Sequence, residues 1–296
     1  MTESGKSLSL WQGRETNRLM HASIRKEDFK EDIFQAEASK YVCRPGDDFA
    51  VFAGAPFTFT TFDRKACDYL VSLFTKENRY KRKNEPPVCS VCVSISDMAN
   101  TFGISTNADA RYTFKNKVKK TLDLLSSFRV EVGTSFCGKL FNEYGKGGNP
   151  CEISVVFSKE HADYLMHHRQ ELVLPEQLFR GSRYDKHGYF VLRKLLAYNR
   201  INNGKRNCIS LKNVILACPL LPSRERIIQN GYHAERDILS PIKHSLSHLS
   251  ESGLLRSWSI SENGQLTYAL AEQTIASIYR PKERDNRPRD GVRSLS

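Results

Sequence analysis

The most informative pattern in the chain is ISDMANTFGISTNADARYTFKNKVKKTLDLLSS, residues 95–127. Residues 96–103 predict a short helix that ends at a glycine, a residue that commonly terminates helices. Residues 104–106 predict a turn, and residues 107–127 predict a longer helix. Mostly apolar side chains recur along one face of this longer helix, at Phe114, Val118, Thr121, Leu122 and Leu125. The sequence therefore predicts a helix-turn-helix whose longer helix packs one face on a core.

The pattern around this helix pair occurs twice. The first copy covers residues 62–157 and the second covers residues 185–270. Each copy has, in order, an amphipathic helix, a short β-branched segment, a small helix, a longer helix, and two strands joined by a turn. This order is typical of a winged helix. We therefore expect a mainly helical α+β fold with two tandem winged-helix domains and an N-terminal extension.

The order of the elements divides the chain into five parts. We expect an N-terminal extension with a helix and a short extended segment at 1–60, a first winged-helix domain at 61–157, a linker helix and connector at 158–183, a second winged-helix domain at 184–280 and a flexible basic tail at 281–296. In the extension, residues 28–38 have helical spacing, and residues 41–61 predict a short hairpin or an extended lead-in. Residues 171–180 predict an irregular connector.

The two copies differ in their predicted wings. In the first copy we expect paired strands at 128–132 and 153–157, with the long glycine- and lysine-bearing loop 133–150 as the wing. In the second copy the strands are expected at 254–260 and 265–270, joined by the tight turn that Asn-Gly sequences favour.

The charge of the chain favours a polyanionic partner. Its 296 residues include 45 Lys and Arg against 33 Asp and Glu, a formal net charge of +12. Such an excess is typical of proteins that bind nucleic acid or an anionic membrane surface. No apolar run reaches the roughly 18–20 residues that span a bilayer, and the first residues do not have the pattern of a signal peptide. We therefore expect a cytoplasmic protein without membrane insertion.

The eight cysteines do not predict a metal site. Cys89 and Cys92 form a Cys-x-x-Cys pair that could be half of a zinc site, but a second close pair is missing. Residues 88–95 alternate with valines and predict a strand, in which cysteine serves as a small hydrophobic residue.

The longer helix of the first copy carries the strongest candidate DNA contacts. Its outward positions are expected to hold an asparagine, which can pair with adenine edges, beside lysines that reach phosphate or guanine. Lys117 is expected on a flank of this helix; the alternative is an ordinary solvated, lysine-rich face. With two lysines of the predicted wing, the candidates are Asn107, Arg111, Tyr112, Lys115, Asn116, Lys119, Lys120, Lys139 and Lys146.

The corresponding helix of the second copy is less basic. Ser240 is expected to cap it and Pro241 to begin it, the pair that helix N-termini prefer. The candidate DNA contacts here are Lys243, His244, Ser247 and His248. The two histidines are four residues apart, but without a nearby acidic or cysteine ligand they predict no metal site.

Sequence motifs for catalysis are missing. The chain has no Gly-x-x-x-x-Gly-Lys-Ser/Thr phosphate loop and no Gly-x-Ser-x-Gly nucleophile turn. His167 and His168 are adjacent, rather than spaced around one hydrophobic residue as in DNA-nicking enzymes with a histidine-bound metal. We therefore expect a binding protein that is not an enzyme and needs no cofactor.

The chain resembles the replication initiator (Rep) proteins of bacterial plasmids and related mobile elements. The segments that carry the resemblance are 62–74, 95–125, 189–198 and 241–270. It implies sequence-specific binding to double-stranded DNA at origin repeats, with each winged helix contacting DNA. It also implies a balance between dimer and monomer and contacts with the host replicative helicase or initiator. The short, arginine-poor reading helix of the second copy departs from this pattern.

Two alternatives remain open on the sequence alone. The same domains could form a transcriptional regulator, because regulators and initiators need the same groove chemistry. The weak second reading helix could instead mark a dimerisation or interaction module, with the first domain as the only DNA reader.

Overall fold

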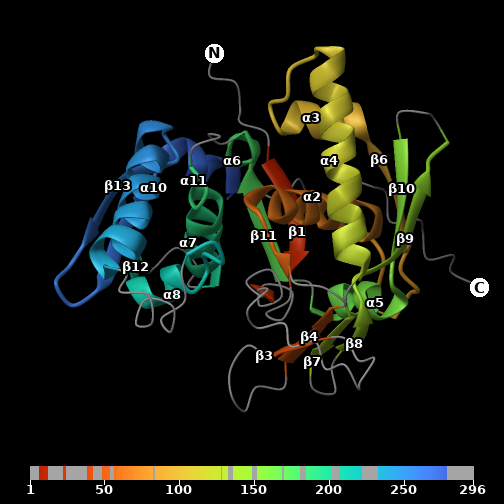
Figure 1. Ribbon diagram of the computed structural model, residues 1–296, viewed down its shortest axis with the longest axis horizontal. Helices are drawn as coiled ribbons and strands as arrows, with labels where there is room; N and C mark the ends of the chain where they lie inside the picture. The colour runs from red at the N-terminus through yellow and green to blue at the C-terminus, as the bar shows by residue number, and fades with distance from the viewer. Residues whose placement is uncertain are drawn as a thin grey trace, which may run out of the picture.

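The computed structural model describes residues 7–12, 23–24, 39–42, 49–53, 57–82, 84–127, 129–132, 136–148, 152–168, 170–180, 185–201, 207–221 and 233–278. The helix expected at 28–38 and the tail at 281–296 lie outside these residues. The chain combines helices with several small antiparallel sheets (Figure 1), so the expected α+β class is confirmed.

The first unit contains a three-stranded sheet and three helices. Its elements are α2 (Thr61–Asn78), β6 (Ser90–Ser94), α3 (Ile95–Thr101), α4 (Ala108–Ser127), β9 (Phe141–Lys146) and β10 (Glu152–Phe157). The strands lie in the order β6-β10-β9, and both pairings are antiparallel. α2 begins at a capping box in which Thr60 and Asp63 exchange side-chain and backbone hydrogen bonds.

The second unit repeats this order. Its elements are α7 (Gly188–Ile201), β12 (Cys208–Ser210), α8 (Leu211–Ile215), η1 (Glu235–Leu239), α10 (Ser240–Glu251), β13 (Leu255–Ile260) and β14 (Gln265–Leu270), followed by α11 (Glu272–Ile278). The strands lie in the order β12-β14-β13, which matches the strand order of the first unit. The repeat seen in the sequence is therefore a repeat in the structure.

The strand pairing expected for the first wing is wrong. β10 pairs with β9, and these strands end and begin at Lys146 and Glu152. β7 (Arg129–Val132) and β8 (Phe136–Lys139) form a separate sheet with two strands of the N-terminal part, β3 (Ser39–Val42) and β4 (Phe49–Ala53). The chain changes sheets at Leu140 and Phe141, which are both buried. β3 and β4 form the hairpin that the sequence allowed, and β5 (Phe57–Thr58) pairs with β2 (Ser23–Ile24).

The connector between the units is regular, contrary to expectation. After α5 (Lys159–His168), the chain forms β11 (Gln170–Pro175) and a single helical turn, α6 (Glu176–Phe179). β11 pairs antiparallel with β1 (Ser7–Gln12), which places leucines of the two strands opposite each other. Leu10, Leu172 and Leu174 are buried, so the ribbon is held by core packing on its apolar face.

The β1–β11 ribbon lies between the two units (Figure 1). β1 packs on α2 of the first unit, whereas β11 packs on α7 and α11. Glu171 adds polar contacts along this junction: its carboxylate accepts from Ser9 and pairs with Arg79 at 3.1 Å. The ribbon therefore joins the units by packing and not as a free linker.

A buried ionic cluster joins α2 directly to α7. The Asp68 carboxylate lies 3.1 Å from Arg64 Nε on its own helix and 2.6 Å from Arg193 Nε on α7. Tyr189 Oη donates a hydrogen bond to the same carboxylate at 2.9 Å. Burial alone would raise the pKa of Asp68, but Arg193 and Arg64 hold it below its ordinary value. The carboxylate is therefore charged at neutral pH.

The longer helix of the second unit does not begin where the sequence indicates. The π-helical turn η1 runs directly into α10, so Ser240 lies inside a continuous helical segment and is not its cap. Pro241 explains the π turn: it has no N–H to donate to the preceding turn, and its ring would clash with the carbonyl four residues earlier. A widened turn accommodates both constraints.

Replacing Asp68 with Asn should destabilise the whole chain. The change leaves two buried guanidinium groups without their carboxylate, and breaking a buried ion pair in this way typically costs about 3–5 kcal/mol of unfolding free energy. Urea denaturation measures the loss. Asp237→Asn is the control, because Asp237 pairs with Arg236 at the surface, and it should leave the midpoint unchanged. An Asp68→Asn protein as stable as the wild type would contradict the role of the cluster.

Candidate nucleic-acid interface

The helix-turn-helix of the first unit is formed by α3, a short turn and α4. The turn contains Gly103, whose φ of 69° lies in the left-handed region that favours glycine. The N–H groups of Phe102 and Ile104 donate to Met98 O and Ala99 O at 3.0 and 2.9 Å, which satisfies the last carbonyls of α3. The predicted two helices and turn are thus confirmed.

Packing beneath α4 fixes its orientation. Phe62 of α2, Phe102 and Phe114 make edge-to-face contacts, with ring centroids 5.5–5.6 Å apart. Further along α4, Thr121 Oγ1 donates a 2.5 Å hydrogen bond to the buried Asp63 carboxylate of α2. Phe114 and Thr121 lie seven residues apart on one face of α4, and the opposite face of the helix is exposed to solvent.

The solvent face of α4 carries the predicted reading residues. Tyr112 is 69% exposed, Lys119 and Lys120 are exposed, and Lys115 and Asn116 are partly exposed. Their spacing of three, four and seven residues places them along one side of the helix. The structure therefore brings together one aromatic ring, one amide and several ammonium groups on a single exposed strip. Lys117 differs, because its Nζ lies 4.3 Å from the Phe62 ring centroid.

Two of the sequence candidates are engaged in holding the motif together. Asn107 Oδ1 accepts from the Asp109 N–H at 2.8 Å, so Asn107 caps α4. The Arg111 guanidinium donates to Ser105 O at 3.0 Å, Ser96 O at 2.9 Å and Asn100 Oδ1 at 2.6 Å. Arg111 thereby braces α4 against α3 and the turn, with three of its nitrogens used. The sequence could not predict this role of Arg111, because the acceptor carbonyl groups come together only in the fold.

The two predicted wing lysines lie in different places. Lys146 is the last residue of β9 and is exposed. Lys139 is exposed too, but it ends β8, in the separate sheet that lies at the end of α4 opposite α3 (Figure 1). The structure thus places Lys146, and not Lys139, on the β9–β10 hairpin.

The second unit presents fewer cations. His244 is exposed and Ser247 is partly exposed, whereas Lys243 Nζ is paired with Glu235 at 2.6 Å. His248 does not point outward as expected: its Nδ1 lies 3.5 Å from the Asp185 carboxylate at the base of α7. Asp185 is held there by Ser245 Oγ at 2.6 Å. The exposed strip of η1 and α10 is therefore closer to neutral than that of α4.

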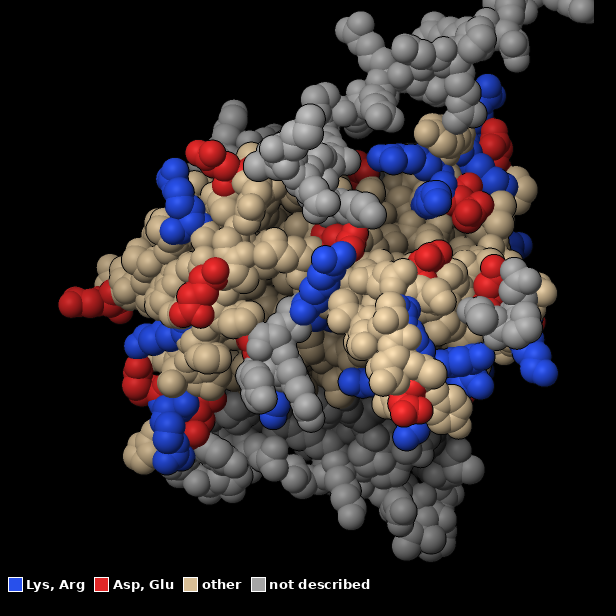
Figure 2. Space-filling view, turned by 90° about the horizontal axis from the view of Figure 1, so that it is seen from above, with Lys and Arg blue, Asp and Glu red and all other residues tan. Residues whose placement is uncertain are grey.

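The described residues have a surface of mixed charge and hold no cluster of side chains that could bind a metal ion. Lys and Arg side chains lie over both units, interspersed with Asp and Glu (Figure 2). Within the described ranges no three His, Cys, Asp or Glu side chains are placed to hold a metal ion. None of the helices in these ranges has an apolar stretch that could span a bilayer. Cys92 was expected to act as a small hydrophobic residue, but it is exposed and its Sγ lies 3.2 Å from the Glu152 carboxylate.

The fold matches that of a solved replication initiator. The chain aligns with the Pi initiator protein, solved in complex with iteron DNA, with a TM-score of 0.54 and 8% sequence identity over 92% of this chain and 100% of that one. A fragment containing domains 2 and 3 of RctB aligns with a TM-score of 0.48 and 12% identity over 78% of this chain and 90% of that one. No protein-family model and no curated protein sequence matches. The Pi comparison confirms the initiator fold that the resemblance implied.

Arg111→Gln should cost more stability than changes on the exposed strip. Losing the guanidinium removes three hydrogen bonds and leaves carbonyl oxygens near the turn without a donor, so we expect a loss of about 1–2 kcal/mol. Lys119→Gln and Lys120→Gln should stay within about 0.5 kcal/mol of the wild type, as is usual at the surface. Chemical denaturation of the three variants checks this difference, and equal stabilities would contradict the bracing role of Arg111.

Proposed function

We propose that this chain is a sequence-specific, double-stranded DNA-binding replication initiator, which binds origin repeats of a plasmid or mobile element and helps to recruit the replication machinery. The observation that carries the proposal is the exposed strip of Tyr112, Asn116, Lys119 and Lys120 on the second helix of a helix-turn-helix. A Pi-like fold and a net charge of +12 support it.

DNA reading follows from the chemistry of this strip. With α4 in the major groove, the Asn116 amide is suited to pair with the N6 and N7 edge of adenine, and the lysines reach phosphate or guanine. Tyr112 supplies an apolar ring with a hydroxyl group at the same surface. Lys146, at the end of β9, is placed to contact phosphate. Phosphate contacts position the protein on the duplex, while the contacts to base edges select the sequence.

Both units act as winged helices in this proposal. They correspond to residues 61–157 and 184–280, and η1 with α10 forms the second reading helix, with His244 and Ser247 on its solvent side. The two reading helices occupy successive major grooves on one face of the DNA. The protein works in the cytoplasm as a monomer or homodimer on the repeats, without enzymatic activity of its own, and presents the marked origin to a host helicase or initiator.

A second candidate assigns DNA reading to the first unit only. The pairing of Lys243 with Glu235 and of His248 with Asp185 leaves the second reading helix with little free positive charge among its described side chains. In that case the second unit serves dimerisation or another protein contact. A transcriptional regulator would use either arrangement equally well, and only the distribution of its binding sites would distinguish it.

Selection of bound DNA tests the proposal. The purified chain is incubated with fragments of its source genome at about 50 and about 200 mM salt, a range over which several phosphate contacts change affinity by orders of magnitude. Recovery of tandem repeats beside its own gene is expected. Scattered promoter sites would indicate a regulator instead, and no enriched sequence at either salt concentration would refute DNA reading.

Neutralising the α4 lysines should weaken binding to the selected sequence. In Lys119→Gln/Lys120→Gln, two phosphate-reaching charges are lost, so the slope of log affinity against log salt should fall by about 2. Lys159→Gln/Lys212→Gln is the control, with the same charge change at exposed positions of α5 and α8. Fluorescence anisotropy titrations measure both slopes. Equal slopes for the two double variants would contradict reading by α4.

His244→Ala/Ser247→Ala separates the two candidates. If both units read DNA, this variant should bind the selected sequence at least about 10-fold more weakly, the cost of about 1.4 kcal/mol of lost contact. Unchanged affinity, measured in the same titration, would favour a single reading unit.

A further inference from the structure

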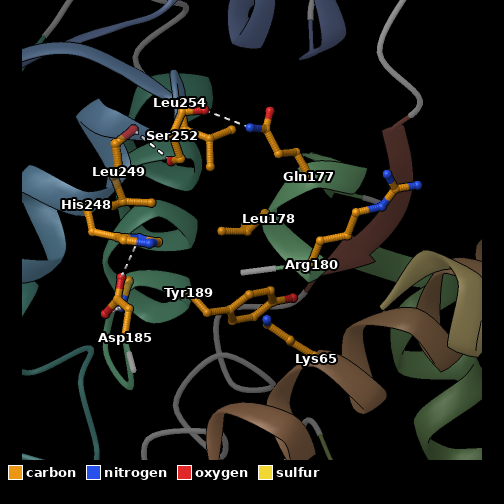
Figure 3. Close-up of a pocket in the computed structure, with 11 residues that line it drawn as sticks. Lys65, Gln177, Leu178, Arg180, Asp185, Tyr189, His248, Leu249, Ser252 and Leu254 are labelled. Carbon is orange, nitrogen blue, oxygen red and sulfur yellow. Dashed lines mark hydrogen bonds and ion pairs between the residues drawn. The ribbon is translucent and has the colours of Figure 1, made fainter. Parts of the chain in front are cut away.

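α6 occupies a position that the DNA-reading proposal leaves unexplained. This single turn, Glu176–Phe179, follows the β1–β11 ribbon and lies between the two units (Figure 1). Its side chains reach in different directions: Gln177 points toward the end of α10, whereas Arg180, the residue that ends the turn, points away from it (Figure 3).

On one side α6 contacts the helix-turn-helix of the first unit. The Phe179 ring packs against Phe102 with centroids 5.7 Å apart. The stem of Arg180 lies against Gly103, where a Cβ atom would come within 3.2 Å of Arg180 Cγ. Both Phe102 and Gly103 belong to the turn that sets the angle between α3 and α4.

On the other side α6 contacts the reading helix of the second unit. Gln177 Nε2 donates a 2.7 Å hydrogen bond to the carbonyl of Ser252, the C-cap residue of α10. Phe179 also packs against Tyr189 of α7 at 5.6 Å between centroids. The same short turn therefore contacts the ends of both helix-turn-helix regions.

A buried lysine holds α6 in place. Lys65 Nζ, from α2, donates to Phe179 O at 2.9 Å and lies 5.4 Å from the centroid of the Tyr189 ring. Beside it, a cavity of about 190 Å³ is lined by residues of α2, α6, α7 and the end of α10. Burial lowers the pKa of Lys65 to about 8, so the ammonium remains mostly charged at neutral pH. The charged group thus links α2 to the backbone of α6.

We propose that α6 is a coupling element that fixes the distance and rotational phase between α4 and α10, so that the chain recognises a two-part DNA site of one fixed spacing. This inference rests on the proposed function and assigns Gln177 and Phe179 as positioning residues, which act through the reading helices and do not touch DNA.

The geometry of DNA makes this coupling stringent. Each inserted base pair moves the second half-site by about 3.4 Å and rotates it by about 35°. A hydrogen bond of 2.7 Å is lost once its atoms separate beyond about 3.2–3.5 Å. The Gln177–Ser252 contact and the Phe179–Phe102 contact therefore cannot both persist when the units follow an inserted base pair.

Binding to DNA of altered spacing tests the coupling. The duplex is the sequence selected by the wild type, with zero, one or two base pairs inserted between its protected halves, and the proteins are the wild type, Gln177→Ala and Phe179→Leu. The matched control is Gln273→Ala: Gln273 Nε2 donates a 2.6 Å hydrogen bond to the neighbouring carbonyl of Gly253, but within the second unit. Gln177→Ala removes an exposed side chain and should fold normally.

The expected result is a change in the spacing profile. Wild type and Gln273→Ala should lose at least about 10-fold in affinity for one inserted base pair. Gln177→Ala and Phe179→Leu should lose only about 2–3-fold in affinity for the same insertion. Each variant lacks one contact that opposes the movement of the units, and one such hydrogen bond or ring contact is worth roughly a 2–10-fold change in affinity. A profile of Gln177→Ala identical to that of the wild type would overturn the coupling role, as would a wild type indifferent to spacing. Failure of the wild type to bind any duplex would instead refute the proposed function.

Discussion

The structure depends on the buried carboxylate of Asp68. It is contacted by a guanidinium group from its own helix, and by a phenol and a guanidinium from α7, 121 and 125 residues further along the chain. Such a cluster contributes little to stability compared with an apolar core of the same volume. Its hydrogen bonds, however, are satisfied only when α2 and α7 meet at one angle. The cluster therefore specifies how the first helices of the two units face each other, and the β1–β11 ribbon and α6 reinforce that arrangement.

Packing around α4 fixes the position of its exposed residues. α4 packs on an aromatic cluster and is hydrogen-bonded to Asp63 of α2, and Arg111 forms hydrogen bonds to α3. The strip from Tyr112 to Lys120 is therefore presented by a fixed backbone. A preorganised strip loses little entropy when it enters a groove. The second unit presents less positive charge among its described side chains, because Lys243 and His248 are paired with carboxylates. Affinity in the proposed complex thus comes mainly from the first unit, while the second adds length and register to the recognised site.

Local sequence patterns predicted the main helices of both units and the exposed strip, because helical periodicity and glycine-terminated turns depend on residues that are close together in the sequence. The pattern of α4 placed Phe114 inward and Lys119 outward, as found. Long-range contacts could not be predicted in this way. The partner of β11 lies near the N-terminus, and the glycine- and lysine-rich composition around β9 hid its pairing with β10. The bracing role of Arg111 depends on backbone carbonyls that converge only in the fold, so its sequence pattern was indistinguishable from that of a DNA contact.

In the proposed complex, the two units meet DNA as one rigid pair. Hydroxyl-radical footprinting of the wild-type chain on its selected duplex measures this most directly. We expect two protected segments on one face of the DNA helix, about one turn or 10–10.5 base pairs apart, with the same separation on every bound repeat. A single protected segment, or two segments whose separation varies from repeat to repeat, would contradict it.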